Sequence, residues 1–208
     1  MKTPIVIALV NTKGGSGKTS TAVHLAWGVA QRHKTVLLDL DHSRSAFVWV
    51  SESGGLEHLP TYTLPPQEAA GKLEGLIEIA RDEGVEYIFI DTPAVLRDVA
   101  IAAMEYADLV LTPIHVGSGD VGQLVEVAAA MRLPLKANSG LLHRVVVNHA
   151  GTMPRVTRET KETVQAAGMT ATRTDIPFRA EYAMSKGGIP RGIHYDLLWR
   201  ELEELLHG

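Results

Sequence analysis

The 208-residue sequence contains no cysteine, which excludes disulfides, thiolate metal sites, iron–sulfur ligation and cysteine nucleophiles. It has no apolar run approaching the ~20 residues of a membrane-spanning helix, and no basic-then-apolar signal segment at its start. A net charge of −4 does not indicate a globally basic nucleic-acid binder. We therefore expect a soluble cytoplasmic protein that does not associate with a membrane.

Apolar runs and helical patterns alternate along the chain, without a linker, an internal repeat or a low-complexity stretch. The expected strands are 5–10, 35–40, 58–64, 85–90, 109–114, 144–148 and 170–176. The expected helices are 19–32, 45–52, 67–83, 96–106, 119–131, 155–167 and 194–207. This alternation predicts one α/β domain over residues 1–208, with a single doubly wound, mostly parallel sheet and helices on both faces.

A glycine-rich turn lies between the first expected strand and the first expected helix. Its residues are Lys13, Gly14, Gly15, Ser16, Gly17, Lys18, Thr19 and Ser20. Glycines let backbone N–H groups point at phosphate oxygens, Lys18 brings a cation to the β- and γ-phosphates, and Thr19 can ligate magnesium. The turn departs from the general G-x-x-x-x-G-K-[ST] pattern at Thr12 and carries an extra lysine, Lys13. A flexible Gly/Ser turn is the alternative, but such a linker is not expected between a strand and a helix.

Three aspartates lie where expected strands end, which is where ligands bind in parallel sheets. Asp91 can hold a magnesium ion beside Thr19; its alternative role is a turn or helix-cap aspartate. Asp39 and Asp41 are two residues apart and face the same way in an extended chain. We expect Asp39 to support the metal, in a structural or outer-sphere role. We expect Asp41 to orient the attacking water, unless it only caps the next helix.

These motifs resemble those of the ParA/MinD ATPases. The resemblance extends over nearly the whole chain, and we identify a deviant Walker A motif at 13–19, a second acidic motif at 38–41 and a Walker B motif at 90–93. Residues 107–113 resemble the strand that follows, and 146–148 resemble the strand whose asparagine approaches the adenine.

Within the family, Asn11-Thr12 before the lysine and the segment 174–179 look like the small plasmid-type ParA proteins. The resemblance therefore places Asn148 and Pro177 at the nucleotide. One departure is Asp41-His42-Ser43, where the family usually has Asp-Pro-Gln.

The resemblance implies a P-loop NTPase fold, ATP/ADP and Mg²⁺ as cofactors, and ATP hydrolysis. It implies a face-to-face homodimer formed with ATP, in which Lys13 contacts the partner's phosphates and so joins Lys18 and Asp41 as a catalytic residue. The dimer would bind DNA without sequence preference and associate with the nucleoid. A ParB-like centromere-binding partner would stimulate hydrolysis and so release the DNA, as in plasmid or chromosome partition.

Charge is unevenly distributed, because residues 143–191 carry eight Lys or Arg against four Asp or Glu. A basic segment on an acidic body fits a local phosphate-binding face, although ordinary solvated helix charge is the alternative. The expected DNA contacts are Arg155, Arg158, Lys161, Arg173, Lys186 and Arg191. Arg179 belongs to the same basic segment but is equally compatible with a place near the nucleotide.

The C-terminal helix has an acidic polar side, which argues against a MinD-like membrane role.

Two other functions remain compatible with the same loop. One is a ParA-like ATPase that positions a protein cargo rather than DNA. The other is a small-molecule ligase or kinase, which would need an added substrate pocket. No helix-turn-helix segment precedes the first strand, so we do not expect sequence-specific operator binding.

Overall fold

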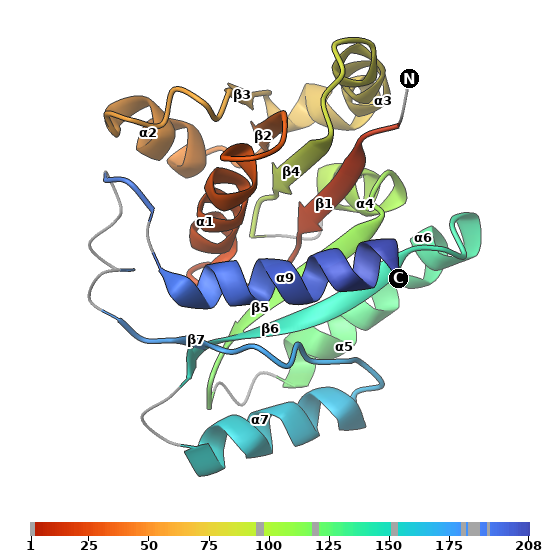
Figure 1. The fold of residues 1–208 in the computed structure, drawn as a ribbon. Coiled ribbons are helices and arrows are strands. Elements are labelled where there is room, and N and C mark those ends of the chain that lie inside the picture. Colours follow the sequence, from red (N-terminus) through yellow and green to blue (C-terminus); the bar gives the residue numbers. More distant parts are fainter. Residues whose placement is uncertain are drawn as a thin grey trace.

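The computed structural model describes residues 3–94, 98–117, 121–150, 154–179, 182, 188–190 and 192–208. Within them, seven strands form one sheet in the order β3-β2-β4-β1-β5-β6-β7, and every neighbouring pair is parallel (Figure 1). The strands are β1 (Ile5–Leu9), β2 (Thr35–Asp39), β3 (Thr61–Thr63), β4 (Tyr87–Asp91), β5 (Leu109–His115), β6 (Leu142–Ala150) and β7 (Ile176–Pro177). The predicted doubly wound sheet is therefore confirmed.

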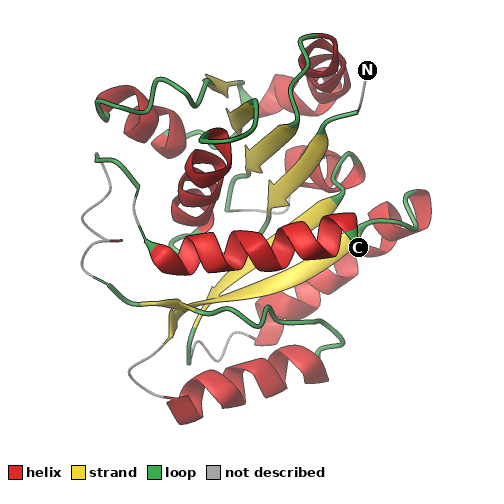
Figure 2. Ribbon diagram, in the orientation of Figure 1, coloured by secondary structure: helices red, strands yellow, loops and turns green. Residues whose placement is uncertain are grey.

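The helices divide between the two faces of the sheet (Figure 2). They are α1 (Lys18–Ala30), α2 (Ser45–Glu52), α3 (Pro66–Asp82), α4 (Asp98–Glu105), α5 (Val121–Ala130), α6 (Arg132–Ala137), α7 (Pro154–Ala166) and α9 (Ile193–His207). Apolar residues of α1, α2 and α9 share one core with Ile7 and Leu9 of β1, whereas Val6 and Ala8 face a second core with α3 and α4. This two-residue alternation is why a central strand must be apolar throughout.

The structure differs from several predicted elements, and the strand expected at 58–64, for example, is shortened to β3. The strand expected at 170–176 is reduced to β7 and one bridge between Ala171 and Val145. Several carbonyl oxygens of this segment accept hydrogen bonds from side chains instead of from a neighbouring strand. Lys161 donates to the carbonyls of Thr172 and Arg173, and the Thr172 hydroxyl donates to the carbonyl of Thr174. The helix expected to end at residue 131 is followed directly by α6, whose proline at position 134 lies in the first turn, where proline is tolerated.

The strand register brings the predicted site residues to one edge of the sheet. Asp91, the last residue of β4, is level with Leu9 on β1 and with Asp39 on β2. The phosphate loop starts just beyond Leu9, so the loop and both carboxylates lie at the same carboxyl edge. None of the described helices is long and apolar enough to cross a membrane.

Candidate nucleotide site

The glycine-rich turn folds into a loop whose shape depends on glycine at two positions. Gly15 and Gly17 have φ angles of 74° and 97°, a region that L side chains rarely adopt. A Cβ atom on Gly17 would lie 2.3 Å from Nδ2 of Asn148, which itself donates to the Ser16 carbonyl at 3.1 Å. The loop is therefore closed against β6 by Asn148, and the expected approach of Asn148 to the adenine stays a prediction.

A second asparagine fixes the start of the loop. Asn11 is buried; its Nδ2 donates to the Pro113 carbonyl at 2.6 Å and its Oδ1 accepts from the Lys13 amide at 3.1 Å. β5 thereby holds the main chain at Lys13, while the Lys13 side chain is exposed.

The two lysines of the loop have different environments. Lys18 is only 6% exposed and its Nζ donates to the Lys13 carbonyl at 3.1 Å, so the ammonium group folds back over the loop. Burial lowers the pKa of Lys18, and the nearby charges of Asp91 and Asp41 oppose that shift. A buried cation held at a glycine-rich loop is suited to bind phosphate oxygens.

Thr19 and Asp91 form the pair expected of a magnesium site. The Thr19 hydroxyl donates to Asp91 Oδ2 at 2.7 Å, and the Asp91 side chain is 1% exposed. Burial raises the pKa of Asp91 to about 7, with the Thr19 hydrogen bond opposing and the charge of Asp39 adding to the shift. Its Oδ1 is buried and has no hydrogen-bond partner among the described residues. A hydroxyl and a carboxylate with one unsatisfied oxygen fit the all-oxygen preference of magnesium.

Asp39 and Asp41 have separate roles in the fold. Asp39 is fully buried, and its two oxygens accept from the amides of Asp41 (3.0 Å) and Phe47 (2.9 Å), so it fixes the turn into α2. Burial raises the pKa of Asp39 and these amides oppose the shift. Asp41 is half-buried and accepts from the Ser43 amide at 2.8 Å. The geometry gives Asp39 the structural part of its expected role, and its support of a metal stays a prediction.

A small cavity of about 90 Å³ adjoins the loop, and Gly17, Ser20, Asn148, Pro177 and Arg179 are among its lining residues. Asn148 Oδ1 is buried without a partner among the described residues, so it is available to accept from a ligand amine. Asn148, Pro177 and Ser20 are thus brought together with the loop, and Arg179 lies there too.

Sequence reasoning missed an aromatic group at this cavity. The rings of His115 and His149 stack with centroids 4.0 Å apart, and Phe178 approaches His149 edge-on at 5.0 Å. His149 has a φ of 60°, which is uncommon for a residue with a side chain. The two histidines are far apart in the chain, and only the pairing of β5 with β6 brings them together.

Where the structure describes them, the residues expected to contact DNA form ion pairs with acidic residues of the same chain. On α7, Arg155 lies 2.8 Å from Glu159 and Arg158 lies 3.7 Å from Glu162, whereas Arg173 pairs with Glu204 of α9 at 2.9 Å. The expected contacts at positions 186 and 191 lie outside the described residues.

Lys161 differs from the other expected DNA contacts because it points inward. Its Nζ lies 2.8 Å from Asp175 Oδ1 and donates to the Thr172 and Arg173 carbonyls, and its side chain is 29% exposed. Lys161 therefore fastens α7 to the segment before β7, and DNA contact by this set stays a prediction.

Comparisons with known proteins identify relatives of this chain. A "Maintenance of carboxysome distribution protein A" of Gloeobacter kilaueensis is 34% identical over 145 residues, which cover 69% of this chain and 62% of that protein. The "Chromosome-partitioning ATPase Soj" of Thermus thermophilus is 33% identical over 52% of this chain and 54% of its own length. The chain therefore matches less than two thirds of the length of these two relatives.

Among solved structures, the MinD cell division protein of Aquifex aeolicus superposes with a TM-score of 0.74 at 19% identity, covering 96% of this chain and 97% of that one. This likeness confirms the fold. The sequence profile described as "CobQ/CobB/MinD/ParA nucleotide binding domain" matches residues 7–187, which include the loop, the three aspartates and Asn148. The chain therefore belongs to the CobQ/CobB/MinD/ParA family of nucleotide-binding domains.

Proposed function

We propose that this protein is a magnesium-dependent ATPase that acts as an ATP-switched dimer in partition or positioning. The observation that carries the proposal is the Thr19–Asp91 pair, with its buried unsatisfied Oδ1, beside the buried ammonium of Lys18. A phosphate cradle alone would need no such carboxylate. A cradle with a carboxylate and hydroxyl at its base fits a nucleotide bound together with a divalent ion.

The chain's own groups have distinct tasks in the proposed reaction. The loop amides and Lys18 bind the phosphates, and Thr19 and Asp91 would hold magnesium, which when bound neutralises charge on the β- and γ-phosphate oxygens. Asp41, at the edge of the site, orients the attacking water. Asn148 and Pro177 border the space proposed for the base.

The contrast between the two lysines supports the dimer. Lys18 is buried over its own loop, whereas the Lys13 side chain is exposed at the rim with its main chain fixed by Asn11. An exposed cation on a rigid loop is placed to reach the phosphates of a second subunit and to stabilise charge there in trans.

Mixing two inactive variants tests this arrangement directly. Lys13→Ala and Asp41→Ala should each abolish most ATP hydrolysis as homodimers, while Asp82→Ala, on the exposed end of α3, serves as control. In a mixed dimer, one site combines Asp41 from one subunit with Lys13 from the other, so mixing the variants should restore part of the activity. A mixture that remains inactive, although sedimentation shows mixed dimers, would refute the action of Lys13 in trans.

For the cargo, we propose nonspecific DNA as the track and a ParB-like or adaptor protein as the stimulating partner. The two relatives, a protein for maintenance of carboxysome distribution and a chromosome-partitioning ATPase, favour either chromosome partition or the distribution of a protein assembly. DNA retention should require ATP, weaken steeply with salt and disappear with ADP. Equal retention with both nucleotides would contradict the switch. Turnover coupled to a small-molecule acceptor would instead support a ligase or kinase.

A further inference from the structure

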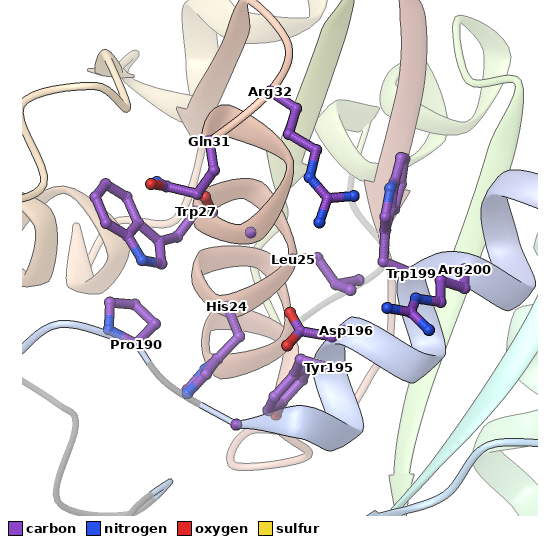
Figure 3. A pocket seen from close by; sticks show the side chains of 12 residues that line it. His24, Leu25, Trp27, Gln31, Arg32, Pro190, Tyr195, Asp196, Trp199 and Arg200 are labelled. Atoms are coloured by element: carbon purple, nitrogen blue, oxygen red, sulfur yellow. The ribbon is translucent and has the colours of Figure 1, made fainter.

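A second cleft, of about 370 Å³, lies between α1 and α9 (Figure 3). Gly28, in the last turn of α1, forms part of its lining, and a Cβ atom there would meet only Asp196 Oδ1, at 3.8 Å. Glycine is unfavourable within a helix, so helix stability does not explain a glycine here. A clash does not explain it either, because a Cβ atom would fit, and the effect of the glycine is to leave space. The absent side chain keeps the cleft open across the α1 surface.

Two guanidinium groups enter this cleft from different elements. Arg32 follows the end of α1 and Arg200 lies on α9, and Figure 3 shows both directed toward the region of Asp196. Within the described part of the chain, none of these three side chains has a hydrogen bond or an ion pair. The arginines of α7, in contrast, are paired with glutamates. Arg32 and Arg200 therefore present unneutralised, planar donors suited to a phosphate or carboxylate group.

Aromatic side chains form part of the remaining lining of the cleft. Trp27 is partly buried and lies on the opposite side of the cleft from Arg32 and Arg200 in Figure 3, and Trp199 is 9% exposed and packs edge-on against Tyr87. A flat ring could lie over Gly28 against Trp27, since no side chain projects from that position. The unpaired Asp196 carboxylate would then accept a hydrogen bond from a hydroxyl or amine of the same ligand.

We propose that the α1/α9 cleft binds a small phosphorylated molecule with a planar ring, of the nucleoside monophosphate class. The volume lies near the lower end of the range of small-molecule sites. Arg32 and Arg200 hold the phosphate, Trp27 stacks on the ring, and Asp196 binds a sugar hydroxyl or an exocyclic amine.

This cleft is separate from the candidate nucleotide site but borders it. Tyr195 lines both the cleft and the cavity next to Gly17, and its ring stacks on His24 at 4.2 Å. The Nδ1 atom of His24 lies 2.7 Å from the carbonyl oxygen of Ser20. Ser20 is one helical turn before His24, in the first turn of α1, where the phosphate loop ends. One aromatic layer thus separates the two sites, and the inference does not depend on ATP hydrolysis.

Tryptophan fluorescence provides the test, because two of the three tryptophans line the cleft. The protein, without nucleotide or with one equivalent of magnesium and ATPγS on the phosphate loop, is titrated with AMP, adenosine or inorganic phosphate. AMP should quench the fluorescence saturably, with a dissociation constant near or below about 1 mM in both cases, and bind at least ~10-fold more tightly than adenosine or phosphate.

Two kinds of variant define the site. The double variant Arg32→Gln/Arg200→Gln should weaken AMP at least ~10-fold. Gly28→Leu, which fills the cleft and favours the helix, should abolish AMP binding without lowering the melting temperature. Gly75→Leu, an open helical glycine of α3, and Arg132→Gln on α6 are matched controls that should bind AMP normally.

Three results would overturn the proposal. These are the absence of saturable quenching up to about 10 mM AMP, affinity unchanged in both the arginine and the Gly28 variants, and binding of a hexaglutamate peptide in place of AMP. The last result would assign the cleft to an acidic protein segment. If Gly28→Leu fails to fold, the arginine variant, which changes only exposed side chains, still decides the question.

Discussion

Replacing Asp91 with asparagine should separate the stability of this fold from its magnesium site. The Asp91 carboxyl is fully buried beside Thr19, and its pKa is raised from 3.8 to about 7. Between these two values the unfolded chain carries the charge and the folded chain holds the proton. The contribution of Asp91 to the free energy of unfolding of the metal-free protein therefore falls as pH rises through this window, and it stays low above pH 7.

The size of the effect follows from the pKa shift. A rise from 3.8 to about 7 corresponds to about 4 kcal/mol of lost stability once the carboxyl is fully ionised. In Asp91→Asn, the amide oxygen can still accept from Thr19, but the amide nitrogen takes the place of an oxygen that has no described partner, which costs about 1–3 kcal/mol. We therefore expect the variant to be more stable than the wild type by about 1–3 kcal/mol at pH 8, and less stable by a similar amount at pH 4.

Urea unfolding without divalent ions, at pH 4, 6 and 8, measures this difference. Asp82→Asn, at an exposed position, is the control that should follow the wild type at every pH. Adding magnesium and ADP should stabilise the wild type by mass action more than Asp91→Asn, which keeps the phosphate loop but lacks the carboxylate proposed to hold magnesium. A wild-type-minus-variant difference that is independent of pH would refute the argument that burial raises the pKa of Asp91.

Three further predictions concern other parts of the molecule. Gly17→Ala should lower the free energy of unfolding by about 1–3 kcal/mol, because the new Cβ atom strains a positive φ and clashes with Asn148. It should also weaken nucleotide binding in a calorimetric titration, and wild-type affinity would contradict the loop geometry. Lys161→Met should lower the melting temperature because it leaves Asp175 without its ion pair, whereas an exposed α7 change such as Arg155→Gln should not; equal melting temperatures would show that Lys161 has no structural role. Burial lowers the pKa of His24 from 6.5 to about 4, so the contribution of His24 to stability should fall by up to about 3 kcal/mol as pH drops through that window. The difference in unfolding free energy between the wild type and His24→Phe in urea should therefore change with pH by this amount, and a difference independent of pH would exclude the effect.

The fold and the phosphate site could be predicted because their signals are local. Each buried parallel strand must be apolar on both faces, so β1, β4 and β5 appear as continuous apolar runs. The glycines and Lys18 are adjacent in the sequence, and Asp91 directly follows the apolar run 85–90. Once the strands are known to be parallel, the shared carboxyl edge follows without further information.

Side-chain pairing across the sheet could not be predicted in this way. The sequence placed Asp39 and Asp41 together, but burial and the amides of α2 made Asp39 a fixed element of the turn and left Asp41 at the edge of the site. The contact of His115 with His149 depends on the register between β5 and β6, which no local pattern encodes.

The sequence by itself determined that this chain forms a parallel α/β domain with a phosphate loop, since strand hydrophobicity and turn chemistry are properties of adjacent residues. Only the tertiary structure decided which charges are neutralised, because that depends on distances between elements remote in the chain. Lys161 and Arg173, expected at a DNA surface, pair with acidic residues. Arg32 and Arg200, which no sequence signal distinguished, line one cleft between α1 and α9 without an ion pair among the described residues.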